Sequence, residues 1–260
     1  MKGPFPVVGV IGAGSLPRLM IAPAIALGIE LFFLAERSNS QACTVLTFVD
    51  SVPASVIRVL EEEGLAVRPG SHAIESVNRV NYVLNHVCHD DDIQIAVTVA
   101  RSPHGQACAW TPTLILRTPG NLYSTQTPVP SLTENRVIDA QKIALEVAAE
   151  VGAVGVMTIE ICIRADELLV KKLTLGPHEF GNWTTDGSRT SQFEQHLRAI
   201  LDLPLGDPSM TARYAVTGNF LGGLQSDMYR PYLHLMARTP ALKFHQYRED
   251  VRQGDSLGHV

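Results

Sequence analysis

The chain has 260 residues and a mass of 28.3 kDa, enough for one large core or two small domains. Hydrophobic residues make up 45% and charged residues 18%, which disfavours a disordered chain. The net charge of −5 argues against a nucleic-acid binder, and no apolar run approaches the ~18 residues of a membrane span. The N-terminal residues show no signal-peptide pattern.

Four cysteines, Cys43, Cys88, Cys108 and Cys162, lie far apart with no CxxC pair. Three of them stand in apolar, strand-like contexts, where a free thiol behaves as a small hydrophobic group. We therefore expect free cysteines in a reducing, cytoplasmic compartment.

Residues 1–90 are typical of a doubly wound α/β domain with a parallel sheet. Apolar strands alternate with helices, separated by glycine turns, and a strand, glycine turn, helix and strand make a βαβ unit. The expected strands are 6–12, 29–35, 44–49 and 65–67, and the expected helices are 16–27, 54–63 and 73–86. The turn Gly12-Ala13-Gly14 presents backbone N–H groups to an anion. The third glycine of a dinucleotide fingerprint is replaced by Pro17, so a tight turn is the favoured interpretation.

Residues 91–260 predict an α+β domain with an antiparallel sheet. We expect a hairpin of 93–100 and 107–117, a loop at 118–133, and a helix at 136–151 capped by Thr133 or Asn135. A second hairpin is expected at 154–163 and 168–173, followed by a polar segment at 175–190 and a helix at 190–202. Two further strands are expected near 213–220 and 241–247. The stretch 86–92 before them has metal-capable side chains in no zinc-like spacing, and a solvated linker is favoured.

Glu160 lies within an apolar strand, so its carboxylate needs a cation, a hydrogen-bond partner or protonation. Lys171 and Lys172 lie on the partner strand of the same hairpin. Neighbouring residues of a strand face opposite ways, so one of the two can face Glu160. A structural ion pair and a catalytic carboxylate beside a lysine are both compatible with this pattern.

A polar and aromatic loop, 176–194, leads into the helix at 190–202. Loops of this kind on a rigid scaffold often carry binding sites. Its candidate site residues are His178, Glu179, Asn182, Trp183, Asp186 and Arg189. Thr190 or Ser191 with Glu194 also resembles a capping box, which is a purely structural feature.

Several segments, in order along the chain, resemble the ATP-grasp enzyme N-carboxyaminoimidazole ribonucleotide synthetase. They are VVGVIGAGSLPRLMIAPAIALGIELFFLAE, TFVDSVP, VRPGSHAI, GPHEFGNWTTDGSRTSQFEQHLRAILDLPLGD and QGDSLGHV. The resemblance implies an enzyme that uses ATP and bicarbonate to carboxylate aminoimidazole ribonucleotide in purine synthesis. It also implies a homodimer.

The chain departs from that family in several places. The family's central domain is expected to be absent, because the acidic link runs directly into the 93–117 hairpin, which resembles the family's third domain. The resemblance then implies a pre-ATP-grasp-like domain at 1–90 and a truncated ATP-grasp-like domain with a small terminal subdomain at 91–260. In the family, magnesium is held by a strand glutamate and a following Asn-Glu pair. Glu160 matches the first, but Lys171 and Lys172 occupy the places of the pair. Asp255 and Ser256 stand where the family has phosphate-binding basic residues.

These departures predict a divergent, ATP-independent enzyme of specialised metabolism, with no cofactor and no metal. It would act on a small organic substrate by acid–base chemistry of the lyase, cyclase or isomerase type. The catalytic candidates are Glu160, Lys172, His178 and Glu179. The substrate-binding candidates are Gly14, Ser15, Lys171, Asn182, Trp183, Asp186 and Arg189. A non-catalytic sensor or assembly partner, and a residual binder of aminoimidazole ribonucleotide, are the alternatives.

Overall fold

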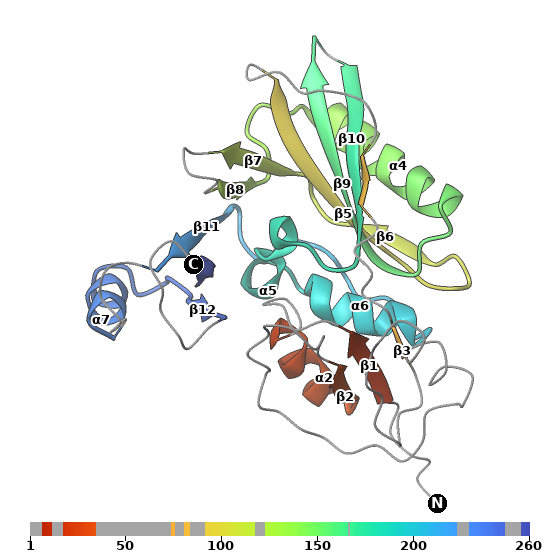
Figure 1. Cartoon of the computed structure of the whole chain (residues 1–260). Helices are drawn as coiled ribbons and strands as arrows, with labels where there is room; N and C mark the ends of the chain where they lie inside the picture. The colour runs from red at the N-terminus through yellow and green to blue at the C-terminus, as the bar shows by residue number, and fades with distance from the viewer. Residues whose placement is uncertain are drawn as a thin grey trace, which may run out of the picture. The chain divides into compact units, whose positions relative to one another are not determined.

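A computed structural model describes most of the chain: residues 7–11, 18–34, 74–75, 81–83, 92–117, 123–165, 167–222, 229–247 and 256–260. The chain divides into two compact units, Met1–Arg79 and Val80–Val260. Figure 1 shows the helices and strands of both units, and each unit is described by itself.

The first unit contains the predicted βαβ arrangement. The described strands β1 (Val7–Ile11), β2 (Glu30–Leu34) and β3 (Ile74–Glu75) form a parallel sheet in the order β2-β1-β3. Helix α2 (Ile21–Leu27) connects β1 to β2 and ends at Gly28, whose φ of 68° is left-handed. Pro23 lies in the first turn of α2, where its missing N–H has no helical acceptor. The expected strands at 44–49 and 65–67 and the helix at 54–63 lie outside the described residues.

The predicted helix at 73–86 is wrong where the structure describes it. Residues 74–75 are β3, which pairs with Gly9 and Val10 of β1. Residues 81–83 form β4 (Asn81–Val83), which pairs antiparallel with β10 of the second unit. Tertiary pairing with distant strands therefore overrides the local helical pattern.

The second unit is built on a large antiparallel sheet, as predicted. In its described part, the strand order is β12-β13-β11-β8-β7-β5-β9-β10-β4, with β6 paired to β5. The strands are β5 (Ile93–Arg101), β6 (Ala107–Ala109), β7 (Thr113–Arg117), β8 (Tyr123–Thr127), β9 (Gly155–Arg164), β10 (Glu167–Leu175), β11 (Ala215–Leu221), β12 (His245–Gln246) and β13 (Ser256–His259). The helices are α4 (Glu134–Glu150), η1 (Glu179–Gly181), α5 (Thr184–Gly187), α6 (Gln192–Ile200) and α7 (Tyr229–Arg238).

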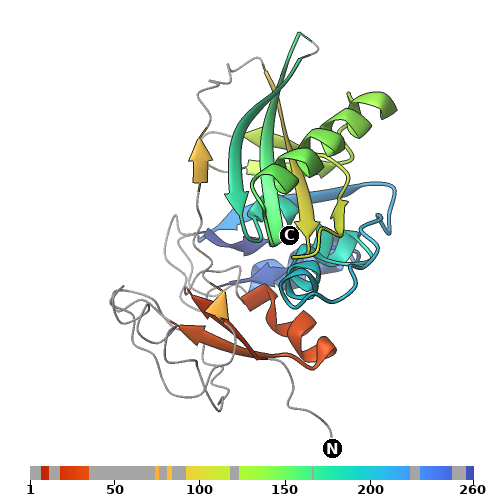
Figure 2. The same cartoon turned by 90° about the vertical axis from the view of Figure 1, so that its right-hand side faces the viewer.

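One face of this sheet packs against α4, as Figures 1 and 2 show. Helix α4 begins at Thr133, whose side chain accepts a hydrogen bond from the N–H of Arg136. Its contact with the sheet is made by Ala140, Ala144 and Ala148, all fully buried at a spacing of four residues. The sheet side of this core consists of alternate residues of the central strands: Ile95, Val97, Val99, Met157, Ile159 and Ile161.

The opposite face of the sheet contacts η1, α5 and α6. Here Ala96 and Ile115 pack against Phe180, while Ala100, Trp110 and Val156 pack against Trp183. Glu160 pairs directly with Ala96 across β9 and β5, so it belongs to this second face.

Several elements of the second unit were not expected from the sequence, among them β13, η1 and α5. The segment 118–133, expected as a loop, contains β8, which pairs with β7 and β11. Its sequence, YSTQT, lacks the apolar alternation by which half-buried strands are recognised. Helix α7, whose described residues include none that are buried, was not expected either.

The cysteine expectation is only partly correct. Cys108 is free, and burial raises the pKa of its thiol. Cys162 takes part in a disulfide bond, so the expectation of free thiols is wrong at that position. Spacing in the sequence does not show which distant cysteines the fold brings together. Among the described helices, none combines the length and the apolar character that crossing a membrane requires.

Candidate functional site

Glu160 lies at the centre of a group of positive side chains on the second face of the sheet. Its side chain is 7% exposed, and three cations approach its carboxylate. Lys172 Nζ lies 3.6 Å from Oε1, and Lys171 Nζ and an Arg117 guanidinium nitrogen lie 3.9 and 3.8 Å from Oε2. We call Glu160, Lys171, Lys172 and Arg117 the cation cluster. In the strand register, Glu160 pairs with Lys172, one of the two lysines from which its partner was expected.

The expectation that only one lysine faces Glu160 is wrong, because β10 contains a β-bulge. Val170 pairs with Ile161 and Lys172 with Glu160, which leaves Lys171 as an extra residue between them. A bulge of this kind redirects side chains that would otherwise alternate. Gln94 of β5 then accepts hydrogen bonds from Lys171 Nζ at 3.4 Å and from Arg117 Nε at 3.2 Å.

The cation cluster does not have the donor set of a magnesium site. Magnesium requires oxygen ligands at about 2.1 Å in an octahedral arrangement, and carboxylates usually provide several of them. Here one carboxylate is surrounded by three cations. No group of three or more metal-capable His, Cys, Asp or Glu side chains exists among the residues that the structure describes. The residues present therefore do not fit the metal that the family resemblance implies.

His178 and Glu179 begin η1, and His178 has a structural role there. Its Nδ1 accepts a hydrogen bond from the backbone N–H of Phe180, and the two rings lie 4.5 Å apart. The buried amide of Gln192 accepts from the N–H of His178 at 3.0 Å and donates to its carbonyl at 2.8 Å. The proposed acid–base pairing of His178 with Glu179 stays a prediction.

Asn182, Trp183 and Asp186 lie together in a pocket of about 200 Å³. Gly187, which follows Asp186, also lines it. The other lining residues come from segments distant in the sequence: Ala212, Tyr214, Ala215, Thr217, Ala241, His245, His259 and Val260. Trp183 is buried and forms a wall, whereas the Asp186 side chain is 43% exposed. Three of the substrate-binding candidates thus share one concave site.

The buried side of this pocket contains a chain of hydrogen bonds. Asn182 Nδ2 donates to the Tyr247 hydroxyl oxygen at 2.8 Å, and this hydroxyl is hydrogen-bonded to His259 Nδ1. Because Asn182 uses its amide as the donor, the Tyr247 hydrogen is directed to His259. His259 is then neutral, with its proton on Nε2. Burial, followed by the charge of Glu179, raises the pKa of Tyr247, which keeps the phenol protonated.

The open side of the pocket contains a histidine–aspartate pair. His245 Nε2 lies 2.6 Å from Asp186 Oδ2, and the His245 ring stacks on His259 with centroids 4.6 Å apart. Burial, and then the neighbouring His245, lowers the pKa of His259 to about 4, while Asp186 acts in the opposite direction. The pocket is therefore lined by a carboxylate, two imidazoles and an aromatic wall.

The low pKa of His259 predicts that acid destabilises the fold. An unfolded histidine gains its proton near pH 6.5, whereas His259 in the fold gains it near pH 4. Neutral His259 therefore contributes fully to the free energy of unfolding above about pH 6.5. This contribution, at most about 3 kcal/mol, is lost as the pH falls towards 4. Urea unfolding near pH 7.5 and near pH 5 measures this loss, and we expect His259→Gln to reduce it.

His104 provides the matched control for this experiment, because its side chain is 82% exposed and pairs with Asp202 at the surface. His104→Gln is expected to keep the full acid sensitivity. Equal losses of stability in wild type and His259→Gln would show that another group carries the effect.

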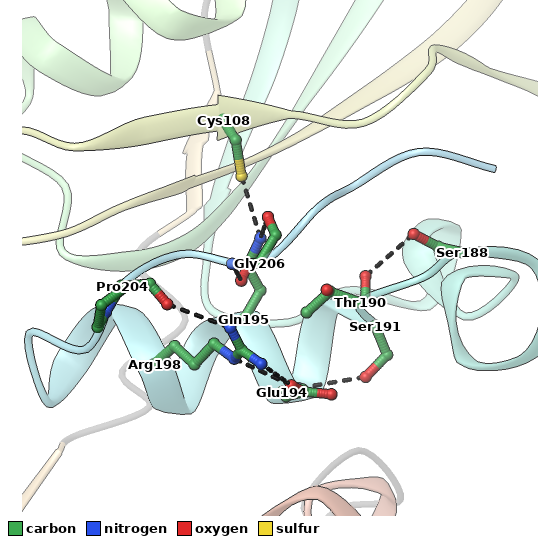
Figure 3. Close-up of polar contacts among 9 residues, drawn as sticks. All are labelled: Cys108, Ser188, Thr190, Ser191, Glu194, Gln195, Arg198, Pro204 and Gly206. Carbon is green, nitrogen blue, oxygen red and sulfur yellow. Dashed lines mark hydrogen bonds and ion pairs between the residues drawn. The ribbon is translucent and has the colours of Figure 1, made fainter.

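Arg189 does not line the pocket. Its Nε lies 3.3 Å from Asp207 Oδ2, and both side chains are more than half exposed. The segment that carries it is held by structural contacts, which Figure 3 shows. Ser191 caps α6 by accepting from the N–H of Glu194, and Gln195 binds both backbone groups of Gly206. The capping role predicted for Ser191 is thus confirmed.

Sequence reasoning missed Arg117 in the cation cluster and Gln94 next to it. It also missed His245 in the pocket and Tyr247 beside it. The strand pairing of β7 with β5 brings Arg117 to Glu160, and the pairing of β12 with β13 brings His245 to His259. Neither pairing has a local signature in the sequence. Gly14, Ser15 and Asp255 lie outside the described residues, and so does the side chain of Ser256.

Residues 67–193 match the family model of the ATP-grasp domain. The N5-carboxyaminoimidazole ribonucleotide synthase of Mycobacterium tuberculosis is 40% identical over 171 residues, which is 64% of this chain and 40% of that protein. The Escherichia coli enzyme of the same name is 34% identical over 139 residues, covering 54% of this chain and 37% of that protein. The chain thus matches about two fifths of the length of these relatives.

Solved structures agree on the fold. The N5-carboxyaminoimidazole ribonucleotide synthetase of Thermus thermophilus matches with a TM-score of 0.73 at 18% identity, covering 97% of this chain and 92% of that chain. The Aspergillus clavatus synthase in complex with ADP and 5-aminoimidazole ribonucleotide matches with a TM-score of 0.74 at 17% identity, covering 98% and 93%.

Two expectations are corrected by these findings. The ATP-grasp domain is not absent, because its family model begins before β4 and continues through β5, α4, β9 and β10. The family resemblance had placed the 93–117 hairpin in the family's third domain. The prediction of an ATP-independent enzyme, which depended partly on that absence, is wrong as well: the ATP-grasp family model and the named synthases that this chain resembles overturn it. The chain therefore contains an ATP-grasp domain over residues 67–193, on the fold of the N5-carboxyaminoimidazole ribonucleotide synthases.

Proposed function

We propose that this chain is an ATP-dependent enzyme of the N5-carboxyaminoimidazole ribonucleotide synthase type. It would use ATP and bicarbonate to carboxylate aminoimidazole ribonucleotide. The observation that carries this proposal is the ATP-grasp match over 67–193, together with 40% identity to a named synthase over 171 residues. A related synthase has been solved with ADP and 5-aminoimidazole ribonucleotide, which indicates the two ligands to test.

The pocket beside Trp183 supports a role in holding the heterocycle. Its volume of about 200 Å³ is below the ~300–1,000 Å³ typical of sites for larger ligands, so it suits a ring better than a whole nucleotide. Trp183 and His245 offer aromatic surfaces, and Asp186 offers a hydrogen-bond acceptor to an amino group.

The test is the rate of ADP formation, measured with and without aminoimidazole ribonucleotide and bicarbonate. We expect ADP to form only when both are present. Saturable binding of aminoimidazole ribonucleotide without any ADP formation would overturn the enzymatic proposal and leave a binding protein. Absence of binding would overturn the proposal entirely.

Variants of the pocket provide a second test. Asp186→Asn and His245→Gln each disturb a charged hydrogen bond, and such bonds contribute about 1.5–3 kcal/mol. We expect each variant to raise the KM for aminoimidazole ribonucleotide about 10- to 100-fold. His104→Gln, the surface control, is expected to keep the wild-type KM. An unchanged KM in both pocket variants would place the ligand elsewhere.

A further inference from the structure

We propose that the cation cluster binds the phosphate groups of a nucleotide directly, with Lys171, Lys172 and Arg117 in the place that a divalent cation would take. The inference depends on the proposed function for the identity of the anion. It concerns the residues of this chain alone, and its consequence is nucleotide binding that does not require magnesium.

The first argument is the balance of charge. Three cations approach one carboxylate, so the cluster keeps a surplus of two positive charges among the described residues. Partly buried charges of one sign repel one another unless counter-charges compensate them. Glu160 compensates only one of the three. An anion with two or more charges would neutralise the rest.

The second argument is the geometry of the contacts. Charge-assisted hydrogen bonds between nitrogen and carboxylate oxygen are usually about 2.7–2.9 Å long. The nitrogen–oxygen distances to Glu160 are 3.6–3.9 Å, so its carboxylate forms no short charge-assisted hydrogen bond with any of the three cations. An ammonium group has three donors and a guanidinium group five. The cluster therefore has donor capacity left for phosphate oxygens.

The third argument is position and access. The Glu160 side chain is 7% exposed, whereas Lys171 and Lys172 are 26% and 29% exposed and Arg117 is 53% exposed. The carboxylate is thus the buried group of the cluster, and the three cations are the groups that solvent and a ligand can reach. Gln94 fixes Lys171 and Arg117 through its side-chain oxygen, which reduces the cost of ordering them for a ligand.

The test is calorimetric titration of the full chain with ADP and with inorganic pyrophosphate, in excess EDTA and in excess magnesium. We expect binding in EDTA at least as tight as binding in magnesium. The double variant Lys171→Met/Lys172→Met should bind both probes about 100-fold more weakly in EDTA, since each lost charged contact costs about tenfold. Arg117 still faces Glu160 in this variant, and thermal unfolding checks that it is folded.

Glu160→Gln distinguishes the two kinds of site most sharply. Removing this negative charge should strengthen pyrophosphate binding several-fold if the cations hold the anion. The same change should weaken binding if Glu160 holds a metal ion between protein and phosphate. Lys142→Met is the matched control, because Lys142 is an exposed lysine of α4, which packs on the other face of the sheet. It should leave both affinities unchanged.

Binding that requires magnesium, or that survives the double lysine variant, would overturn the proposal, and so would failure of both probes to bind. The proposed function fails separately. Tight ADP binding in EDTA without turnover of aminoimidazole ribonucleotide would support the cation cluster and contradict the enzymatic proposal. Turnover with strictly magnesium-dependent ADP binding would do the reverse.

Discussion

Gly258→Ala is expected to disrupt the C-terminal strands and to lower the free energy of unfolding by more than about 3 kcal/mol. Gly258 pairs with Phe220 of β11 on one side and with Gln246 of β12 on the other. A Cβ atom there would lie 2.0 Å from the carbonyl oxygen of His245 and 2.8 Å from the Phe220 ring. The first of these atoms belongs to the backbone of a paired strand, so it cannot move aside as a flexible side chain could.

Thermal and urea unfolding measure this effect. Gly218→Ala is the matched control, because Gly218 lies on the neighbouring strand β11 and its added Cβ would meet only a methyl group of Val260, at 3.9 Å. We expect Gly218→Ala to change stability by less than about 1 kcal/mol. Since β13 also carries His259, Gly258→Ala should weaken ligand binding in the pocket. Equal unfolding midpoints for the two variants would contradict the prediction.

Gln192→Leu is expected to cost about 2–5 kcal/mol, although leucine has a similar volume. Gln192 is fully buried, and its side-chain amide satisfies both the N–H and the carbonyl of His178. Leucine would remove both bonds: the His178 N–H would lose this partner, and the His178 carbonyl would keep only its bond from the N–H of Gly181. A buried polar group left unsatisfied costs about 1–3 kcal/mol, and the second lost bond adds to this. Gly181 packs against the same amide so closely that a Cβ would lie 2.4 Å from Gln192 Oε1. The start of η1 should therefore loosen.

The control for this variant is Gln106→Leu. The Gln106 side-chain oxygen accepts a hydrogen bond from Leu205 N at the surface, where water can replace it. Urea unfolding should show a much smaller loss for Gln106→Leu than for Gln192→Leu. Similar losses would mean that the Gln192 amide does not hold the His178 backbone.

Local patterns were sufficient where neighbours in the sequence are also neighbours in space. The β9–β10 hairpin is closed by a short turn, so its existence and its pairing next to the turn followed from local patterns. Regular alternation from that turn would pair Glu160 with Lys171, and only the bulge shifts the pairing to Lys172. The caps at Thr133 and Ser191 are also local, since each side chain bonds a backbone N–H three residues ahead.

Features that depend on distant pairing were not predictable in this way. The bulge that redirects Lys171 arises from the pairing of β10 with β9, and no residue type in the sequence predicts it. His245 reaches the pocket because β12 pairs with β13, and Arg117 reaches Glu160 because β7 pairs with β5. The expected absence of the central ATP-grasp domain had a different cause. It depended on the acidic link running directly into the 93–117 hairpin, whereas the ATP-grasp family model matches from residue 67 through these strands.

The row of alanines on α4 also affects the mobility of the cation cluster. Alanine has no side-chain rotamers, so Ala140, Ala144 and Ala148 lose no side-chain entropy on burial and have no second packing to adopt. The strands that contact them, β5 and β9, carry Gln94 and Glu160 on their other face. The strands that position Glu160 and Gln94 thus pack on a side of the helix that has no alternative rotamers, so we expect the cluster to keep one arrangement before a ligand binds.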